Sequence, residues 1–243
     1  MDEIKDSVVT EYLGEGTQAP LEVARAVLVF GKNSATYKFS LAKTLLEFDA
    51  SSEVKYGDIG QKFLKHLIEH HELCPHQHNR SSTKLTKAID KHLAEELSWH
   101  DLFSIAEESI YNNVFEAFHT VGGGKIKESA VLFENNKSQK KLTLTESMNS
   151  LQEDNDQKSI LIGETEARWR VVEEAWRKNL SPLLILDERE KSFYTTVNDH
   201  RINLRSAVET LLPYQFGTCF YCRCLLDESL HHMEDQFPDV DHV

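Results

Sequence analysis

A cluster of cysteines constrains this chain more than any other sequence feature. Three of its four cysteines, Cys219, Cys222 and Cys224, lie within six residues, which is not the spacing of a disulfide framework. A Cys-x-x-Cys turn can present two thiolates to one tetrahedral zinc ion, whereas a redox pair usually starts a helix that follows a strand. Because the sequence predicts a helix before Cys219, we expect Cys219 and Cys222 to form a zinc knuckle, with a redox pair as the alternative.

Composition and charge limit the class of protein. The chain has 243 residues, of which 40% are hydrophobic and 28% charged, and this balance fits a soluble globular protein. No apolar run approaches the roughly 20 residues of a membrane helix, and residues 1–6 lack the order of a signal peptide, so we expect a cytoplasmic protein. A net charge of −13 argues against general nucleic-acid binding but leaves room for a local basic groove.

Hydrophobic periodicity predicts a helical region over residues 1–125. We expect helices over residues 21–30, 35–48, 82–97 and 99–121, and a further helix that begins at Asp58. Ser34 and Asp58 are the expected N-caps, because their side chains can accept hydrogen bonds from the free N–H groups of a first turn. Glycines at 122–124 end this region and supply a flexible joint. The region is a candidate surface for a partner protein.

A histidine-rich segment follows the helix that begins at Asp58. Four histidines and one cysteine, His70, His71, Cys74, His76 and His78, lie within nine residues. A metal site is one interpretation of this segment. The other, which we favour, is a polar helix end, because histidine is stabilised near a helix C-terminus and the separated ligand pairs of a structural zinc site are missing.

The rest of the chain mixes strands and helices, so the predicted fold class is α+β and mostly helical. In residues 126–198 we expect a hairpin of strands 130–133 and 142–144, an exposed polar segment at 152–158, a helix over 164–179, and strands at 183–186 and 193–196. Residues 199–243 form the third predicted segment, which begins with a helix over 199–212. Arg201 and Arg205 give this helix basic character and are candidate nucleic-acid contacts.

The last five residues, 239–243, combine carboxylates with an imidazole. Their order, Asp-Val-Asp-His-Val, places Asp241 and His242 on opposite faces of a strand. Hydrolysis of a phosphodiester needs a base that activates water and a divalent cation on the phosphate oxygens. Histidine suits the first role because its pKa lies near neutrality, and aspartate suits the second because Mg²⁺ prefers carboxylate oxygen. Taken alone, this pair is more typical of a solvated acidic segment than of a catalytic site.

Taken in order, the basic-faced helix, the cysteine pair and the Asp-His segment resemble HNH, or ββα-metal, endonucleases. This family includes domains of RNA-guided nucleases and many restriction or phage-defence nucleases, and the resemblance covers residues 199–243. It implies that His242 is the general base and that Asp241 helps to bind a catalytic Mg²⁺ or Mn²⁺. It also implies that Cys219 and Cys222 are the first half of a structural Zn²⁺ site, and that DNA is the substrate.

The family pattern continues beyond the position of Val243 with a second strand and with a helix that carries further ligands. We therefore expect the chain to be a fragment of a longer nuclease, inactive as it stands because the incomplete HNH module has too few ligands. The alternative is a non-catalytic helical adaptor whose zinc knuckle is only structural. A thiol redox protein that acts through Cys219 and Cys222 is a third hypothesis.

Overall fold

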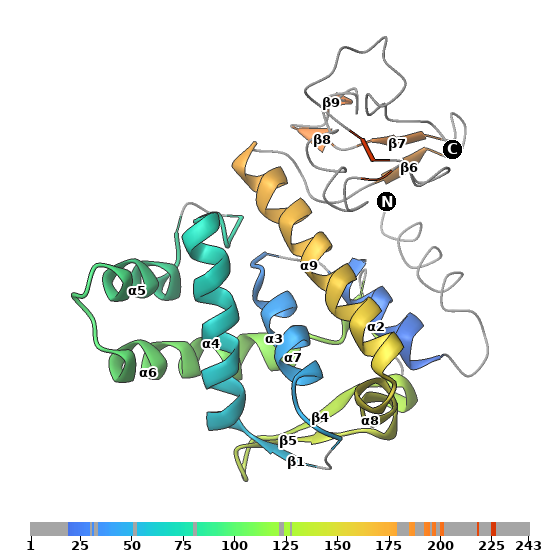
Figure 1. Ribbon diagram of the computed structural model, residues 1–243, viewed down its shortest axis with the longest axis horizontal. Helices are drawn as coiled ribbons and strands as arrows, with labels where there is room; N and C mark the ends of the chain where they lie inside the picture. Colours follow the sequence, from blue (N-terminus) through green and yellow to red (C-terminus); the bar gives the residue numbers. More distant parts are fainter. Residues whose placement is uncertain are drawn as a thin grey trace. The chain divides into compact units, whose positions relative to one another are not determined.

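The computed structural model describes residues 19–29, 31, 34–50, 53–79, 82–121, 124–126 and 128–178, and short pieces at 185–187, 192–194, 196–197, 200–201, 218 and 225–226. These residues form a mostly helical α+β structure with a small three-stranded antiparallel sheet (Figure 1). The predicted fold class is confirmed at this level, and the HNH module stays a prediction. The chain divides into two compact units, Met1–Thr165 and Glu166–Val243, and each is described by itself.

The helices of the first unit follow the predicted apolar pattern. They are α2 (Pro20–Val29), α3 (Tyr37–Leu46), α4 (Tyr56–Leu73), α5 (Lys84–Leu93), α6 (Trp99–Ser109), the π-helical turn η1 (Ile110–Val114), α7 (Phe115–Ala117) and α8 (Glu146–Glu153). Leu41 and Leu45 of α3 are buried, as are Phe63 and Leu67 of α4, so the expected apolar faces do form the core. No helix in the part of the chain that the structure describes is long and apolar enough to cross a membrane.

Ser34 is not the N-cap of α3, and this prediction is wrong. The helix begins two residues later than expected, with Thr36 at its N-cap and no capping bond from a side chain. The cause is a tertiary contact: Ala35 pairs with His78 in an antiparallel bridge, and the Asn79 N–H donates to the Ser34 carbonyl at 3.0 Å. This pairing uses Ser34 and Ala35 for an extended contact, so they are not available for the first turn of the helix.

Asp58 is not the N-cap of α4 either. The helix begins at Tyr56 directly after β1 (Glu53–Lys55), and Lys55 occupies the N-cap in an extended conformation. Asp58 lies within the first turn, where its negative charge still complements the helix dipole. A strand that runs straight into the helix therefore displaces the predicted start.

The sheet joins segments that are distant in sequence. Its strand order is β1-β5-β4, with β4 (Phe133–Asn136) and β5 (Lys141–Leu144) paired as an antiparallel hairpin, and the three strands lie side by side in Figure 1. The predicted hairpin is confirmed, with its first strand a few residues later than expected. Val54, Leu142 and Leu144 are buried on one face. The sheet thus connects β1, from the region 1–125, to strands of the region 126–198.

The segment at 152–158 is mostly exposed or half-buried, as expected, but its first residue is buried. Gln152 lies in α8, is buried, and its side-chain amide donates to the carbonyl of Leu45 at 2.7 Å. Helix α9 (Asn155–Arg177) begins nine residues before the expected start at 164, and it continues from the first unit into the second. Gln152 is polar because it satisfies a buried carbonyl at the end of α3, which a composition-based prediction does not detect.

The described parts of the second unit are the end of α9, two short antiparallel strand pairs, and residues 218 and 225–226. Trp169 and Val172 of α9 are buried, as their spacing predicted. Strands β6 (Ile185–Asp187) and β7 (Ser192–Tyr194) form the predicted antiparallel pair. Strands β8 (Thr196–Val197) and β9 (His200–Arg201) form a second pair, so the helix predicted over 199–212 is wrong at 200–201. The intervening sequence is Asn-Asp, residue types that favour tight turns over helix interiors.

Two glycines of α4 provide a matched test of helix packing. A Cβ at Gly60 would lie 2.9 Å from a ring carbon of Phe103 in α6, whereas a Cβ at Gly57 would meet nothing within 4 Å. We expect Gly60→Ala to destabilise the protein by about 1 kcal/mol, because overpacking outweighs the gain in helix propensity. Gly57→Ala should instead stabilise it by roughly 0.5 kcal/mol. Urea unfolding of both variants checks this, and equal stabilities would contradict it.

Candidate functional site

The residues predicted to carry function lie mainly outside the described part of the chain. This applies to His242, Asp241, Cys219, Cys222 and Arg205. Arg201 contributes its backbone to β9, and its side chain is outside the description. The roles of all six residues, including both metal sites, therefore stay predictions.

One described contact flanks the cysteine pair. Thr218 and Leu225 pair in an antiparallel bridge, so the chain reverses direction between them. Cys219 and Cys222 lie in this interval of the sequence. Antiparallel pairing on either side of the cysteines is compatible with a zinc knuckle, whereas a redox pair belongs at the start of a helix.

The histidine-rich segment connects helices in the first unit. His71 is buried near the end of α4, and its Nε2 lies 2.6 Å from Asp90 Oδ1 in α5. Cys74 Sγ lies 3.9 Å from His76 Nδ1. Within the described residues, no group of three or more histidine, cysteine, aspartate or glutamate side chains could hold a metal ion. His70 and His71 lie in the last turn of α4, where the helix-end interpretation places them.

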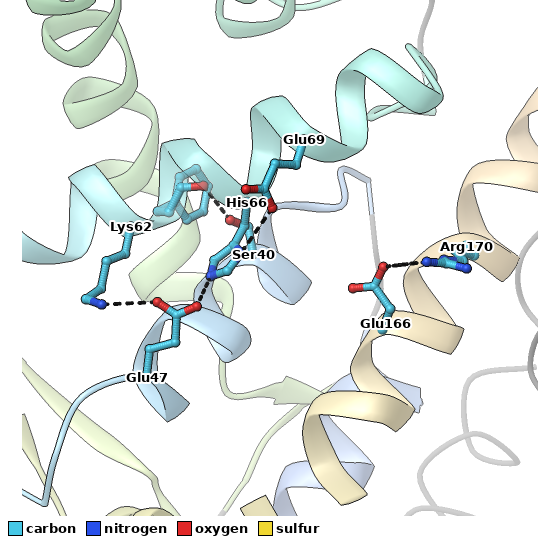
Figure 2. A network of polar contacts seen from close by, with 8 residues as sticks. Ser40, Glu47, Lys62, His66, Glu69, Glu166 and Arg170 are labelled. Carbon is cyan, nitrogen blue, oxygen red and sulfur yellow. Dashed lines mark hydrogen bonds and ion pairs between the residues drawn. The ribbon is translucent and has the colours of Figure 1, made fainter. Parts of the chain in front are cut away.

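A second polar cluster joins the end of α3 to α4. Figure 2 shows Glu47 between Lys62, at 3.1 Å, and His66, whose Nε2 lies 2.7 Å from the carboxylate. The contact to His66 has the distance of a hydrogen bond but not its angle. Burial lowers the pKa of His66 by more than Glu47 raises it, so the imidazole is neutral near pH 7. The cluster is thus held mainly by the Lys62–Glu47 ion pair, and a structural role accounts for it.

The charges around Glu47 and along α9 are likewise explained by contacts between neighbouring side chains. Burial raises the pKa of Glu47, but Lys62 and His66 together outweigh it and the pKa falls below its usual value. Figure 2 also shows the ion pair of Glu166 and Arg170, which lie 3.2 Å apart one helical turn from each other in α9. Both features are typical of helix stabilisation and require no ligand.

Lys38 and His119 are buried titratable side chains that periodicity did not single out. The Lys38 ammonium donates to the Thr120 carbonyl at 3.0 Å, and His119 Nε2 accepts the Leu132 N–H at 3.0 Å. Burial lowers the pKa of Lys38 to about 8. Burial also lowers the pKa of His119 to about 4, and the nearby ammonium groups of Lys38 and Lys125 add to this effect. Perturbed groups of this kind often mark functional sites, but here each has a backbone partner that fixes neighbouring elements.

The cavity beside these elements offers no ligand site. It is a void of about 10 Å³ with an apolar lining. A void of that size is at the lower limit for a single water molecule, which would also need polar partners. The lining residues are Ala24, Leu28, Ala42, Leu45, Leu46, Phe118, Leu132, Met148, Leu151 and Leu161.

Comparisons with known proteins add no relative to this description. No protein-family model, no curated protein and no solved structure matches the chain. Function is therefore inferred from the residues themselves.

Proposed function

We propose that this chain is part of an HNH-type nuclease that hydrolyses DNA phosphodiester bonds, of the kind used in restriction or phage defence, and that the second half of the active site is supplied by further sequence. The observation that carries the proposal is the order of Cys219, Cys222, Asp241 and His242, each of a residue type that the chemistry needs. The antiparallel bridge that flanks the cysteine pair supports it, because this bridge fits a zinc knuckle better than a redox site.

Each residue has a defined role in the proposed reaction. The neutral imidazole of His242 accepts a proton from the water that attacks the phosphorus atom, which is efficient near neutral pH. The carboxylate of Asp241 contributes to binding of Mg²⁺ or Mn²⁺, and such a cation neutralises charge on the scissile phosphate. Cys219 and Cys222 hold one side of a structural Zn²⁺. Arg201 and Arg205 offer positive charge to the DNA backbone.

Plasmid cleavage tests the proposal. The protein, expressed from its complete reading frame, should nick or linearise supercoiled DNA in the presence of Mg²⁺ or Mn²⁺. His242→Ala should slow cleavage by about 10²-fold or more, because general-base catalysis is lost. His100→Ala is the matched control, since it removes a histidine whose side chain is 90% exposed in α6. Undiminished cleavage by His242→Ala would reject the assignment.

Cleavage, rather than zinc content, separates the nuclease from the non-catalytic adaptor. The adaptor also predicts one Zn²⁺ bound through Cys219 and Cys222, but no cleavage with any divalent cation. Replacement of both cysteines by serine should release the zinc in either case. A redox protein is a third outcome, which would be recognised by a thiol pKa well below that of a free cysteine.

A further inference from the structure

Four lysines meet at the turn end of the three-stranded sheet. Lys55 at the end of β1 is directly opposite Lys141 at the start of β5, and Lys141 is in turn opposite Asn136 of β4. The connection between β4 and β5 adds Lys137 and Lys140, both exposed. We call Lys55, Lys137, Lys140 and Lys141 the basic corner. It lies where the β4–β5 connection extends beyond β1 at the lower edge of Figure 1.

Carboxylates balance only part of this positive charge. Lys137 lies 3.0 Å from Glu116, and Lys141 contacts Glu53. Lys55 and Lys140 are both exposed, and neither has a carboxylate partner among the described residues. Like charges directly opposite each other on paired strands destabilise a sheet, and Lys55 and Lys141 are such a pair. Glu53 offsets part of this repulsion through its contact with Lys141, so the charges of Lys55 and Lys140 are the ones left for an anion.

The backbone conformation of Lys140 is a second indication that the basic corner has a function. Its φ of 50° lies in the left-handed region, where glycine or asparagine is usual at the end of such a hairpin connection. The fold does use the backbone of Lys140, because its carbonyl accepts the Tyr56 N–H at 3.0 Å at the start of α4. It does not require the lysine side chain, which is exposed and makes the conformation less favourable. Strain of this kind is a reason to look for a function of the side chain.

We propose that the basic corner contacts the phosphate backbone of duplex DNA. This inference rests on the proposed nuclease function, since the chemistry of the corner selects a polyanion and that function makes DNA the relevant one. Lysines bind phosphate as flexible point charges and release condensed counterions. Contacts of this type position a duplex without reading its sequence. The corner would thus hold the DNA locally on a chain whose net charge is −13.

A double substitution tests the corner. Lys55→Ser with Lys140→Asn removes the two lysines without carboxylate partners, and asparagine tolerates the left-handed conformation. The control is Lys87→Ser with Lys91→Ser, which removes two exposed lysines from α5 and changes the net charge equally. Dissociation constants for a labelled DNA duplex are measured for the full chain by fluorescence anisotropy, with no Mg²⁺ or Mn²⁺ added and at several salt concentrations.

The expected result is specific to the corner. Loss of two phosphate contacts should weaken binding roughly tenfold and lower the slope of log K against log salt by about 2. The α5 control should bind within about twofold of the wild type, because general electrostatic attraction is largely screened beyond a Debye length. Equal weakening in both double variants, unchanged binding in the corner variant, or no DNA binding by the wild type would each overturn the proposal.

Two further comparisons keep the inference independent of folding and of catalysis. Lys140→Gly removes the same charge, suits the left-handed backbone, and should reproduce the effect of Lys140→Asn on binding. Cleavage is measured separately with Mg²⁺. If the corner variant cleaves DNA as fast as the wild type, the proposal for the basic corner is rejected and the nuclease proposal stands. If DNA binding depends on the corner but the protein does not cleave DNA, the proposal for the basic corner stands and the nuclease proposal is rejected.

Discussion

Acidification from pH 6.5 to pH 4 should cost the protein about 3 kcal/mol of stability through His119 alone. In the folded state the pKa of this residue is lowered from 6.5 to about 4, first by burial and then by Lys38 and Lys125. Its Nε2 accepts the backbone N–H of Leu132 at 3.0 Å, which requires a deprotonated nitrogen. Protonation would therefore break this hydrogen bond and place a charge in the core.

The direction in which stability changes with pH follows from proton uptake on unfolding. Between the folded and unfolded pKa values the unfolded chain binds a proton that the folded chain does not, so unfolding is favoured as the pH falls. Above pH 6.5 both states are neutral at this residue, and the stability contribution is complete. His66, whose pKa burial also lowers, acts in the same direction. The total loss on acidification should thus exceed the contribution of His119.

Urea unfolding of the wild type and of His119→Gln at a series of pH values isolates the contribution of His119. Glutamine keeps an acceptor for the Leu132 N–H but does not titrate, so the pH dependence of its unfolding free energy should be flatter. The variant will be less stable at pH 7, because the ring packing against Phe133, at 4.5 Å between centroids, is lost. The same pH dependence in both proteins would show that His119 is not the titrating group.

The fold was predictable where the information is local. Phe63 and Leu67 of α4 are one helical turn apart, so their periodicity indicates the buried face without any knowledge of the tertiary structure. The β4–β5 hairpin is equally local, because strand, turn and strand are adjacent in sequence. Helix ends were less predictable, since the bridge between Ala35 and His78 decides the start of α3 from over 40 residues away.

The proposed sites also differ in whether their residues are close together in the sequence. Cys219, Cys222, Asp241 and His242 form a local pattern of ligand and base types, which a sequence can suggest without a structure. The basic corner has no such signal. Lys55 lies more than 80 residues before Lys137, and only the register of β1 against β5 brings them to one end of the sheet. Its proposed role in DNA binding could therefore be suggested only after the strand pairing was known.

Gly31→Ala should be the most destabilising single substitution considered for the first unit, at about 3 kcal/mol. Gly31 is buried, and a Cβ at this position would lie 2.3 Å from the carbonyl oxygen of Val27 and 2.5 Å from Lys38 Nζ. The lysine chain can move, but the carbonyl belongs to the last turns of α2 and can shift only if that helix end is distorted. The obstacle is thus backbone rather than side chain.

A second variant separates these two obstacles. Lys38→Ala in the Gly31→Ala background removes the ammonium contact and leaves the contact with Val27, so most of the loss caused by Gly31→Ala should persist relative to Lys38→Ala alone. The free energies of unfolding of the four proteins, from urea titrations, complete this double-mutant cycle. Full recovery in the Lys38→Ala background would mean that the ammonium is the obstacle and that the end of α2 adapts. Because Lys38 also donates to the carbonyl of Thr120 in the short strand β2 (Thr120–Val121), the same cycle measures how strongly Gly31 determines the position of the buried lysine that joins α3 to β2.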